Sequence, residues 1–212
     1  MIEAAVVNME VGNIGKMLGM LTRVGIRPHL TSSASDIADA HLVILPGVGA
    51  FGDAMASLHG KNLVKPLQDH VRSGRPLLGV CVGMQILAEE SEEHGHHAGL
   101  GFIRGKVVKL RSNDPRIRVP NMGWCDLAVH RRTATFESLP ENAAAYFAHS
   151  YHLSGTEDEA IAATIDFGGQ RIVAAIEHKN ITAFQFHPEL SQDVGLDLLL
   201  AFARRHAATP LT

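Results

Sequence analysis

Short apolar runs alternate along this chain with segments whose apolar residues recur every three or four positions. Such runs predict strands buried on both faces, and we expect them at residues 2–7, 41–45 and 77–80, with a shorter strand near 27–30. The helical spacing is clearest between the first two strands, where Gly25 ends the series Ile14, Met17, Leu18, Leu21 and Val24.

Further helices are expected at residues 36–40, 53–57, 62–73 and 84–90, and an amphipathic helix at 193–206 closes the chain. Another apolar strand begins at Ile181 and is expected to end at His187. Strands that alternate with helices predict an α/β fold with a mostly parallel central sheet covered on both faces. In such sheets the reactive groups gather at the carboxyl ends of the strands.

The middle of the chain has a different pattern. Residues 102–110, 124–129 and 146–149 alternate between apolar and polar, which predicts short strands in an antiparallel extension of the sheet. This region is also locally basic, and its cations can form either an ordinary solvated face or a partner surface: Arg104, Lys106, Lys109, Arg111, Arg116 and Arg118.

Composition narrows the class of protein. With 212 residues and 46% hydrophobic content, the chain is expected to form one domain, residues 1–212. A net charge of −3 gives no indication of nucleic-acid binding. No apolar run approaches the roughly 18 residues of a membrane span, and Glu3 stands where a signal peptide is basic, so a cytoplasmic protein with reduced thiols is expected. No Cys/His spacing matches a zinc site, and we expect residues 94–99 to form a solvated loop and the chain to need no metal or cofactor.

Cys81 follows the strand at 77–80 and precedes a helical segment. A cysteine on a sharp strand-to-helix turn lies beside free N–H groups at the positive end of a helix dipole, which favours the thiolate. Gly79 and Gly83 permit the tight turn. The same window also fits a small buried side chain at a strand end, so it supports both interpretations.

Two other segments favour catalysis. The glycine-rich residues 46–53 lack the phosphate-binding patterns, but next to Cys81 they can supply an oxyanion-hole donor. His187 and Glu189 follow the last strand, and Pro188 between them is expected to keep the chain extended so that both side chains point the same way. Together with Cys81 they form a nucleophile, a base and a group that orients the base.

Five motifs resemble one family over essentially the whole chain. They are residues 45–55 (LPGVGAFGDAM), 79–85 (GVCVGMQ), 120–124 (PNMGW), 146–151 (YFAHSY) and 186–189 (FHPE). In this order they are similar to the class I, triad-type glutamine amidotransferases, and among these to the glutaminase subunits of imidazole glycerol phosphate synthase. The resemblance implies a flavodoxin-like α/β fold and hydrolysis of L-glutamine to glutamate and ammonia.

The resemblance also implies roles for individual residues. Cys81 would attack the glutamine amide, His187 would act as the base and Glu189 would orient it, while backbone N–H groups of Val82 and of Val48 or Gly49 would bind the oxyanion. The glycine-rich turn at 46–49 would switch the site on. Residues expected to contact glutamine are Gly47, Gly49, Gln85, Glu93, His149, Ser150 and Tyr151.

The implied partner is a HisF-type (β/α)8-barrel synthase subunit, which would form a heterodimer with the chain and receive the ammonia in histidine biosynthesis. It would contact Asn13, Met122, Trp124 and Leu190. Some positions differ from the usual family residues: Asn8, Glu10, Asn121, Cys125 and Leu190. Because Leu190 replaces an interface lysine, a paralogue that supplies another barrel synthase, such as one that amidinates a surface sugar, stays an alternative. A non-catalytic regulatory scaffold is the third interpretation.

Overall fold

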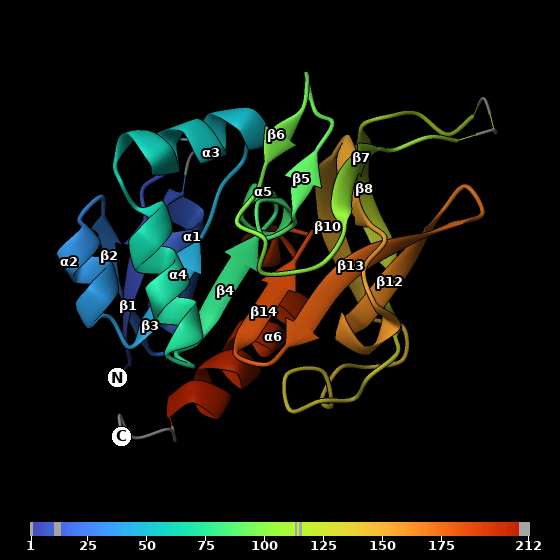
Figure 1. Ribbon diagram of the computed structural model, residues 1–212. Helices are drawn as coiled ribbons and strands as arrows, with labels where there is room; N and C mark the ends of the chain where they lie inside the picture. Colours follow the sequence, from blue (N-terminus) through green and yellow to red (C-terminus); the bar gives the residue numbers. More distant parts are fainter. Residues whose placement is uncertain (1, 11–13, 113, 115, 208–212) are drawn as a thin grey trace.

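The computed structural model describes residues 2–10, 14–112, 114 and 116–207. A central eight-stranded sheet has the order β2-β1-β3-β4-β14-β13-β12-β9 (Figure 1). Its parallel half consists of β2 (Ile26–Thr31), β1 (Ile2–Val7), β3 (Leu42–Leu45), β4 (Leu77–Val80) and β14 (Ile181–Phe184). The antiparallel half consists of β13 (Gln170–His178), β12 (Ile161–Phe167) and β9 (Ala128–Val129).

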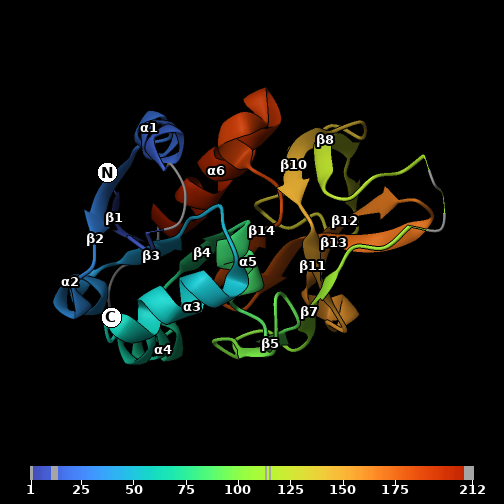
Figure 2. The same cartoon turned by 90° about the horizontal axis from the view of Figure 1, so that it is seen from above.

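Helices cover both faces of the parallel half. Seen from above, α1 (Gly15–Arg23) and α6 (Gln192–Ala207) lie on one face, and α3 (Phe51–Gly60) and α4 (Val64–Arg72) lie on the other (Figure 2). The short α2 (Ala34–Asp39) contacts α4 beside the edge strand β2. None of the helices in the described ranges is long and apolar enough to cross a membrane.

The buried strands divide the core into two clusters. Ala4 and Val6 of β1 pack in the cluster under α1 and α6, whereas Ala5 and Val7 pack in the cluster on the opposite face. Successive side chains of a strand point to opposite faces, so a strand buried on both sides must be apolar throughout. This confirms the α/β fold and explains why the apolar runs predicted β1, β3 and β4 well; β14 begins at Ile181 as predicted but ends at Phe184, three residues before the expected end.

The central sheet has an antiparallel extension, as predicted, but most of its strands are not the predicted ones. Two smaller sheets contain most of the segments that were assigned to it, namely β10 (Ala144–His149) with β8 (Asn121–Asp126), and β11 (Tyr151–Ser154), β7 (Lys106–Lys109), β5 (Glu90–Ser91) and β6 (His97–Ala98). The central sheet is instead extended by the β12–β13 hairpin, which the sequence analysis missed. Burial gives the reason: β12 and β13 are buried on both faces, whereas every second residue of β10 is more exposed.

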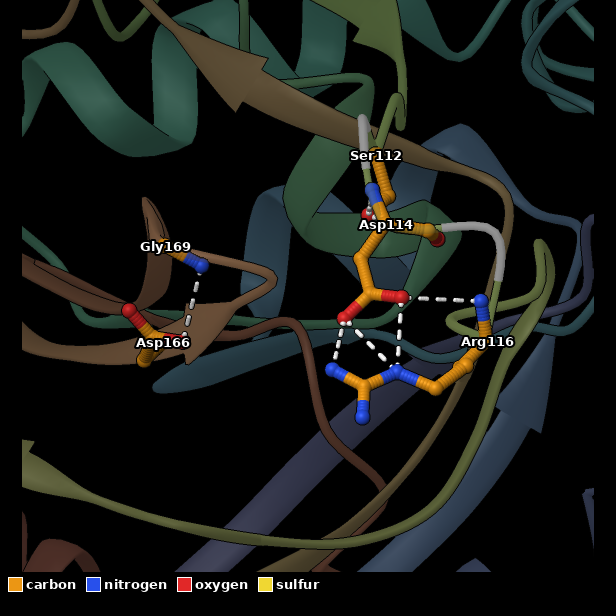
Figure 3. Close-up of polar contacts among 5 residues, drawn as sticks. All are labelled: Ser112, Asp114, Arg116, Asp166 and Gly169. Carbon is orange, nitrogen blue, oxygen red and sulfur yellow. Dashed lines mark hydrogen bonds and ion pairs between the residues drawn. The ribbon is translucent and has the colours of Figure 1, made fainter.

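The basic residues lie on β7 and in the segments on either side of it, including the loop that leads to β8, and they favour the solvated-face interpretation. Arg116 is exposed and paired with Asp114 at 2.7 Å in this loop (Figure 3). The loop packs against the β12–β13 turn, where a Cβ on Gly168 would lie 2.7 Å from Ser112 Oγ. Arg104 is paired with Glu157 at the surface, and exposed pairs of this kind add little stability.

Part of the segment at residues 94–99, which was predicted as a solvated loop, is a strand. His97 and Ala98 form β6, which pairs with β5. The His97 ring lies against the start of α3, so close that a Cβ on Gly52 would approach it to 2.7 Å. Among the described residues, no cluster of His, Cys, Asp and Glu side chains is placed to hold a metal ion.

Candidate active site

Cys81 occupies a strained turn between β4 and α5. Its backbone has φ 53° and ψ −112°, a conformation that a non-glycine residue adopts only when the surrounding structure holds it there. Its N–H donates to the carbonyl of Phe184 at 2.7 Å, which ties the turn to the end of β14. The side chain is buried, as expected for a nucleophile held at a strand end.

Glycine at position 83 is required by close packing. A Cβ there would lie 1.8 Å from the carbonyl oxygen of Leu45, inside any possible contact distance. The turn therefore rests directly on the end of β3, and this contact places the glycine-rich loop that follows Leu45 next to Cys81. The predicted neighbourhood of the two segments is present in the structure.

The helix predicted at residues 84–90 is wrong in length. Helix α5 covers only Val82–Gln85, and β5 follows at Glu90–Ser91. The chain leaves the helix because the carbonyls just past it accept from a distant segment instead of from the next helical turn: Leu100 donates to Ile86, and Phe102 to Leu87. A single turn has few aligned peptides, so the helix dipole contributes little at Cys81. The N–H of Val82 remains a donor without an acceptor inside the helix.

His187 and Glu189 form the predicted pair, but by a different backbone path. Strand β14 ends at Phe184, and Pro188 begins a short 3-10 turn, Pro188–Leu190, rather than extended chain. Proline suits this first helical position because it has no N–H to satisfy. The turn folds Glu189 back toward the ring, so that His187 Nδ1 lies 2.9 Å from Glu189 Oε1.

This pairing fixes the tautomer of His187. A carboxylate only accepts, so Nδ1 carries the proton and Nε2 is directed toward Cys81. Nε2 is buried and has no hydrogen-bond partner in the described part of the chain. Burial by itself lowers the pKa of His187, but the adjacent Cys81 thiol and the Glu189 carboxylate outweigh it and raise the pKa to about 10. The ring can therefore take and keep the thiol proton.

Ser191 holds the backbone of His187 and was missed by the sequence analysis. It is buried, its hydroxyl donates to the carbonyl of His187 at 2.6 Å, and it accepts from the N–H of Tyr146 at 2.9 Å. The N–H of His187 in turn donates to the carbonyl of Tyr146 at 2.9 Å. A serine four residues after a candidate base was the only signal in the sequence.

A cavity of about 310 Å³ opens beside Cys81, a size within the range of small-ligand sites. Most residues expected to contact glutamine line it: Gly49, Gln85, Glu93, His149, Ser150 and Tyr151. Gly47 does not; it lines a smaller adjoining cavity with His187 and Glu189. Val48 lines both.

Glu93 connects the cavity to the glycine-rich loop. Its Oε2 accepts a 2.7 Å hydrogen bond from the N–H of Phe51, the first residue of α3. Only about 9% of the residue is exposed, so this carboxylate lies between the loop and the cavity as a buried negative charge. It is suited to bind a ligand ammonium group.

His149, which also lines the cavity, is held neutral. Burial is the main cause that lowers its pKa, to about 4. Nδ1 lies 2.9 Å from the carbonyl of Tyr151 and must donate to it, so Nε2 accepts from Asn121 Nδ2 at 3.3 Å. The unusual Asn121 thus fixes the ring, and Cys125 Sγ lies 3.6 Å from the same amide.

The expected partner-facing residues are distributed unevenly. Met122 is 66% exposed and Trp124 49%, and both lie on β8; Met122 also lines the cavity together with the exposed Val48. Leu190 is only half exposed, and lies in a groove with Met20 and Arg23. Asn13 lies outside the described residues.

Known proteins resemble the chain in sequence and in fold. A model of the class I glutamine amidotransferase family matches residues 11–202. The imidazole glycerol phosphate synthase subunit HisH of Trichormus variabilis is 43% identical over 93% of each chain, and that of Bacillus subtilis is 40% identical over 95% of this chain and 96% of its own. HisH of Aquifex aeolicus is 40% identical over 94% and 95%.

Solved structures agree on the fold. PurLQS from Thermotoga maritima superposes with a TM-score of 0.75 at 19% identity, covering 97% of this chain and 99% of its own. A structure of a glutamine amidotransferase superposes with a TM-score of 0.73 at 20% identity, covering 94% and 98%. The chain belongs to the class I glutamine amidotransferase family and, within it, to the HisH subunits of imidazole glycerol phosphate synthase.

Proposed function

We propose that the chain hydrolyses L-glutamine and delivers the ammonia to a HisF-type barrel subunit in histidine biosynthesis. One observation carries the proposal: a strained, buried Cys81 faces the free Nε2 of a histidine whose other nitrogen is bonded to a carboxylate. This arrangement can form a thiolate and return its proton to a leaving group.

In the first half-reaction, His187 Nε2 takes the thiol proton and Cys81 Sγ bonds to the side-chain carbonyl carbon of glutamine. The carbonyl oxygen becomes negative and is stabilised by the N–H of Val82 and by one N–H of the loop at Val48 or Gly49. Each such donor contributes roughly 3 kcal/mol in known hydrolases. His187 then protonates the departing nitrogen, which leaves as ammonia and leaves a γ-glutamyl thioester on Cys81.

In the second half-reaction, a water molecule loses a proton to His187 and attacks the thioester carbon. The C–S bond breaks, His187 returns the proton to sulfur, and glutamate leaves. Glu189 keeps the ring in one orientation through both steps by accepting from Nδ1. Glu93 is placed to bind the α-ammonium group of the substrate, and residues 149–151 line the same cavity.

The partner proposal is supported by three exposed apolar side chains: Val48 and Met122 line the cavity, and Trp124 lies two residues after Met122 on β8. Exposed aromatic and Met side chains are enriched in protein interfaces. A barrel subunit seated there would cover the cavity and receive ammonia before it reaches solvent. The relatives named HisH are subunits of imidazole glycerol phosphate synthase, and that assignment motivates the choice of partner.

The test is glutamine hydrolysis by the pure chain, alone and with the HisF subunit of the same organism and its ribonucleotide ligand. We expect a large increase on mixing. Cys81→Ala should abolish hydrolysis and keep the complex intact, whereas Cys125→Ala, which removes the other thiol, should retain hydrolysis. Hydrolysis by Cys81→Ala would refute the nucleophile. A chain that hydrolyses glutamine but ignores HisF would redirect the proposal to the paralogue alternative.

A further inference from the structure

A buried amide, Gln185, contacts the catalytic sulfur and has no role in the chemistry described above. It follows β14 directly, is fully buried, and its Nε2 lies 3.9 Å from Cys81 Sγ. The backbone N–H of Gln185 donates to Ala174 at 2.9 Å, so the residue is fixed at its base as well.

The orientation of this amide is determined by its neighbours. A side-chain amide can present either its oxygen or its NH2 group to a neighbour, and the choice follows from the hydrogen bonds around it. The carbonyl of Tyr151 can only accept, and Gln85 Nε2 donates to it at 2.8 Å. The same Nε2 donates to Gln185 Oε1 at 3.1 Å.

The oxygen of Gln185 is therefore turned toward Gln85, and its NH2 group toward the sulfur. Reversing Gln185 would place two NH2 groups face to face at one end and a carbonyl oxygen against a thiolate at the other. Both contacts are repulsive, and in a buried site an unsatisfied amide costs roughly 1–3 kcal/mol. The carbonyl of Tyr151 thus orients Gln85, and Gln85 orients Gln185, so that an NH2 group lies next to the Cys81 sulfur.

We propose that Gln185 is a catalytic residue that donates a hydrogen bond to the Cys81 thiolate, and that Gln85 is the positioning residue that holds this donor in the correct orientation. A distance of 3.9 Å is long for a neutral thiol. A thiolate attracts the donor more strongly, so the bond stabilises the reactive form more than the resting one. The same hydrogen bond would restrict the position of Cys81 Sγ, which lines the cavity.

The first measurement reports the reactivity of Cys81 directly and needs neither glutamine nor a partner. The rate of alkylation by iodoacetamide is recorded against pH, and the modified peptide is identified by mass spectrometry so that Cys125 is counted separately. We expect Gln185→Met, which keeps the volume but has no donor, to move the alkylation midpoint upward by about one pH unit. Glutaminase kcat should fall roughly tenfold with KM nearly unchanged.

Gln85→Met provides a second variant that leaves Gln185 in place. Freed from its partner, the Gln185 amide can turn, so the midpoint should move in the same direction by a smaller amount. The double variant should shift no further than Gln185→Met alone, because Gln85 acts on the sulfur only through Gln185. Gln170→Glu, on the exposed end of β13, is the control and should leave the profile unchanged.

An alkylation profile that does not respond to Gln185→Met, or shifts that add in the double variant, would overturn this inference. The inference rests on the proposed function only in treating Cys81 as the nucleophile. If alkylation of Cys81 leaves glutamine hydrolysis intact, the proposed function fails; if alkylation abolishes hydrolysis but the variants share the wild-type profile, only the role of Gln185 fails.

Discussion

Replacing Gly195 by alanine should displace Glu189 relative to His187 and Cys81 without changing any of these three residues. Gly195 lies in the first turns of α6, and a Cβ there would be 1.9 Å from the carbonyl oxygen of Pro188. Real Cβ contacts almost never fall below 3.0 Å, so helix and turn must move apart by about 1 Å. The moved turn, Pro188–Leu190, is the one that carries Glu189.

Two magnitudes follow from this displacement. Overpacking of this kind costs about 1–3 kcal/mol of unfolding free energy, because the obstacle is backbone rather than a flexible side chain. A misplacement of about 1 Å at a catalytic group costs roughly 100-fold in rate. We therefore expect kcat/KM for glutamine, measured with the barrel subunit present, to fall about 100-fold, with a lower midpoint in urea unfolding.

Gly19→Ala is the matched control. Gly19 is also in a helix, α1, but it is exposed, and a Cβ added there would have nothing within 4 Å. The same substitution should there raise the unfolding free energy by about 0.5–1 kcal/mol and leave hydrolysis unchanged. If Gly195→Ala retains both stability and kcat/KM, the close approach does not position the triad and the reasoning is refuted.

Four further predictions concern charge and contact. Glu189→Gln should lower the pKa of His187 from its raised value and reduce kcat, and a pH-rate profile identical to the wild type would contradict the pairing. Because the pKa of His187 is raised, this residue contributes its full share to the unfolding free energy below pH 6.5 and loses it as the pH rises through about 10. In urea unfolding measured against pH, Glu189→Gln should make this loss of stability smaller. Three buried histidines have pKa values lowered to about 4: His70, His149 and His206. As the pH falls from 6.5 toward 4, each should therefore lower the unfolding free energy by up to roughly 3 kcal/mol in the same urea titrations. Trp124→Ala should weaken binding of the barrel subunit by about 2 kcal/mol in calorimetry while hydrolysis by the isolated chain persists, and unchanged affinity would place the interface elsewhere.

The parts of the fold that the sequence predicted well are those with one physical cause. Strands β3 and β4 are apolar because both faces are buried, and their limits follow directly from the apolar runs. The family was predictable for a similar reason, since each of its motifs lies in one short segment, and the family model and the HisH relatives confirm it. The roles of the triad residues remain predictions that the experiments above test.

The parts that failed depend on residues far away in the chain. Helix α5 stops after one turn because residues 100–103 donate hydrogen bonds to the carbonyls of residues 86–88, which would otherwise continue the helix, and no local sequence pattern predicts this. The pairing of the strands between residues 102 and 149 depends on which of their faces are buried. The alternation of apolar and polar residues does not reveal this. Gln185 could have been noticed, because it is a polar residue inside an apolar run, and such residues are buried only with partners.

The order of strands in the central sheet has a consequence for synthesis. Strand β14 is the last strand of the chain, yet it lies between β4 and β13 in the middle of the sheet. During translation the thiol therefore emerges about 100 residues before its base, and two strand edges stay open until β14 is inserted. If Cys81 and His187 act as proposed, glutamine hydrolysis can begin only once this strand is in place, and the first turnover of a newly made molecule would report that its sheet is closed.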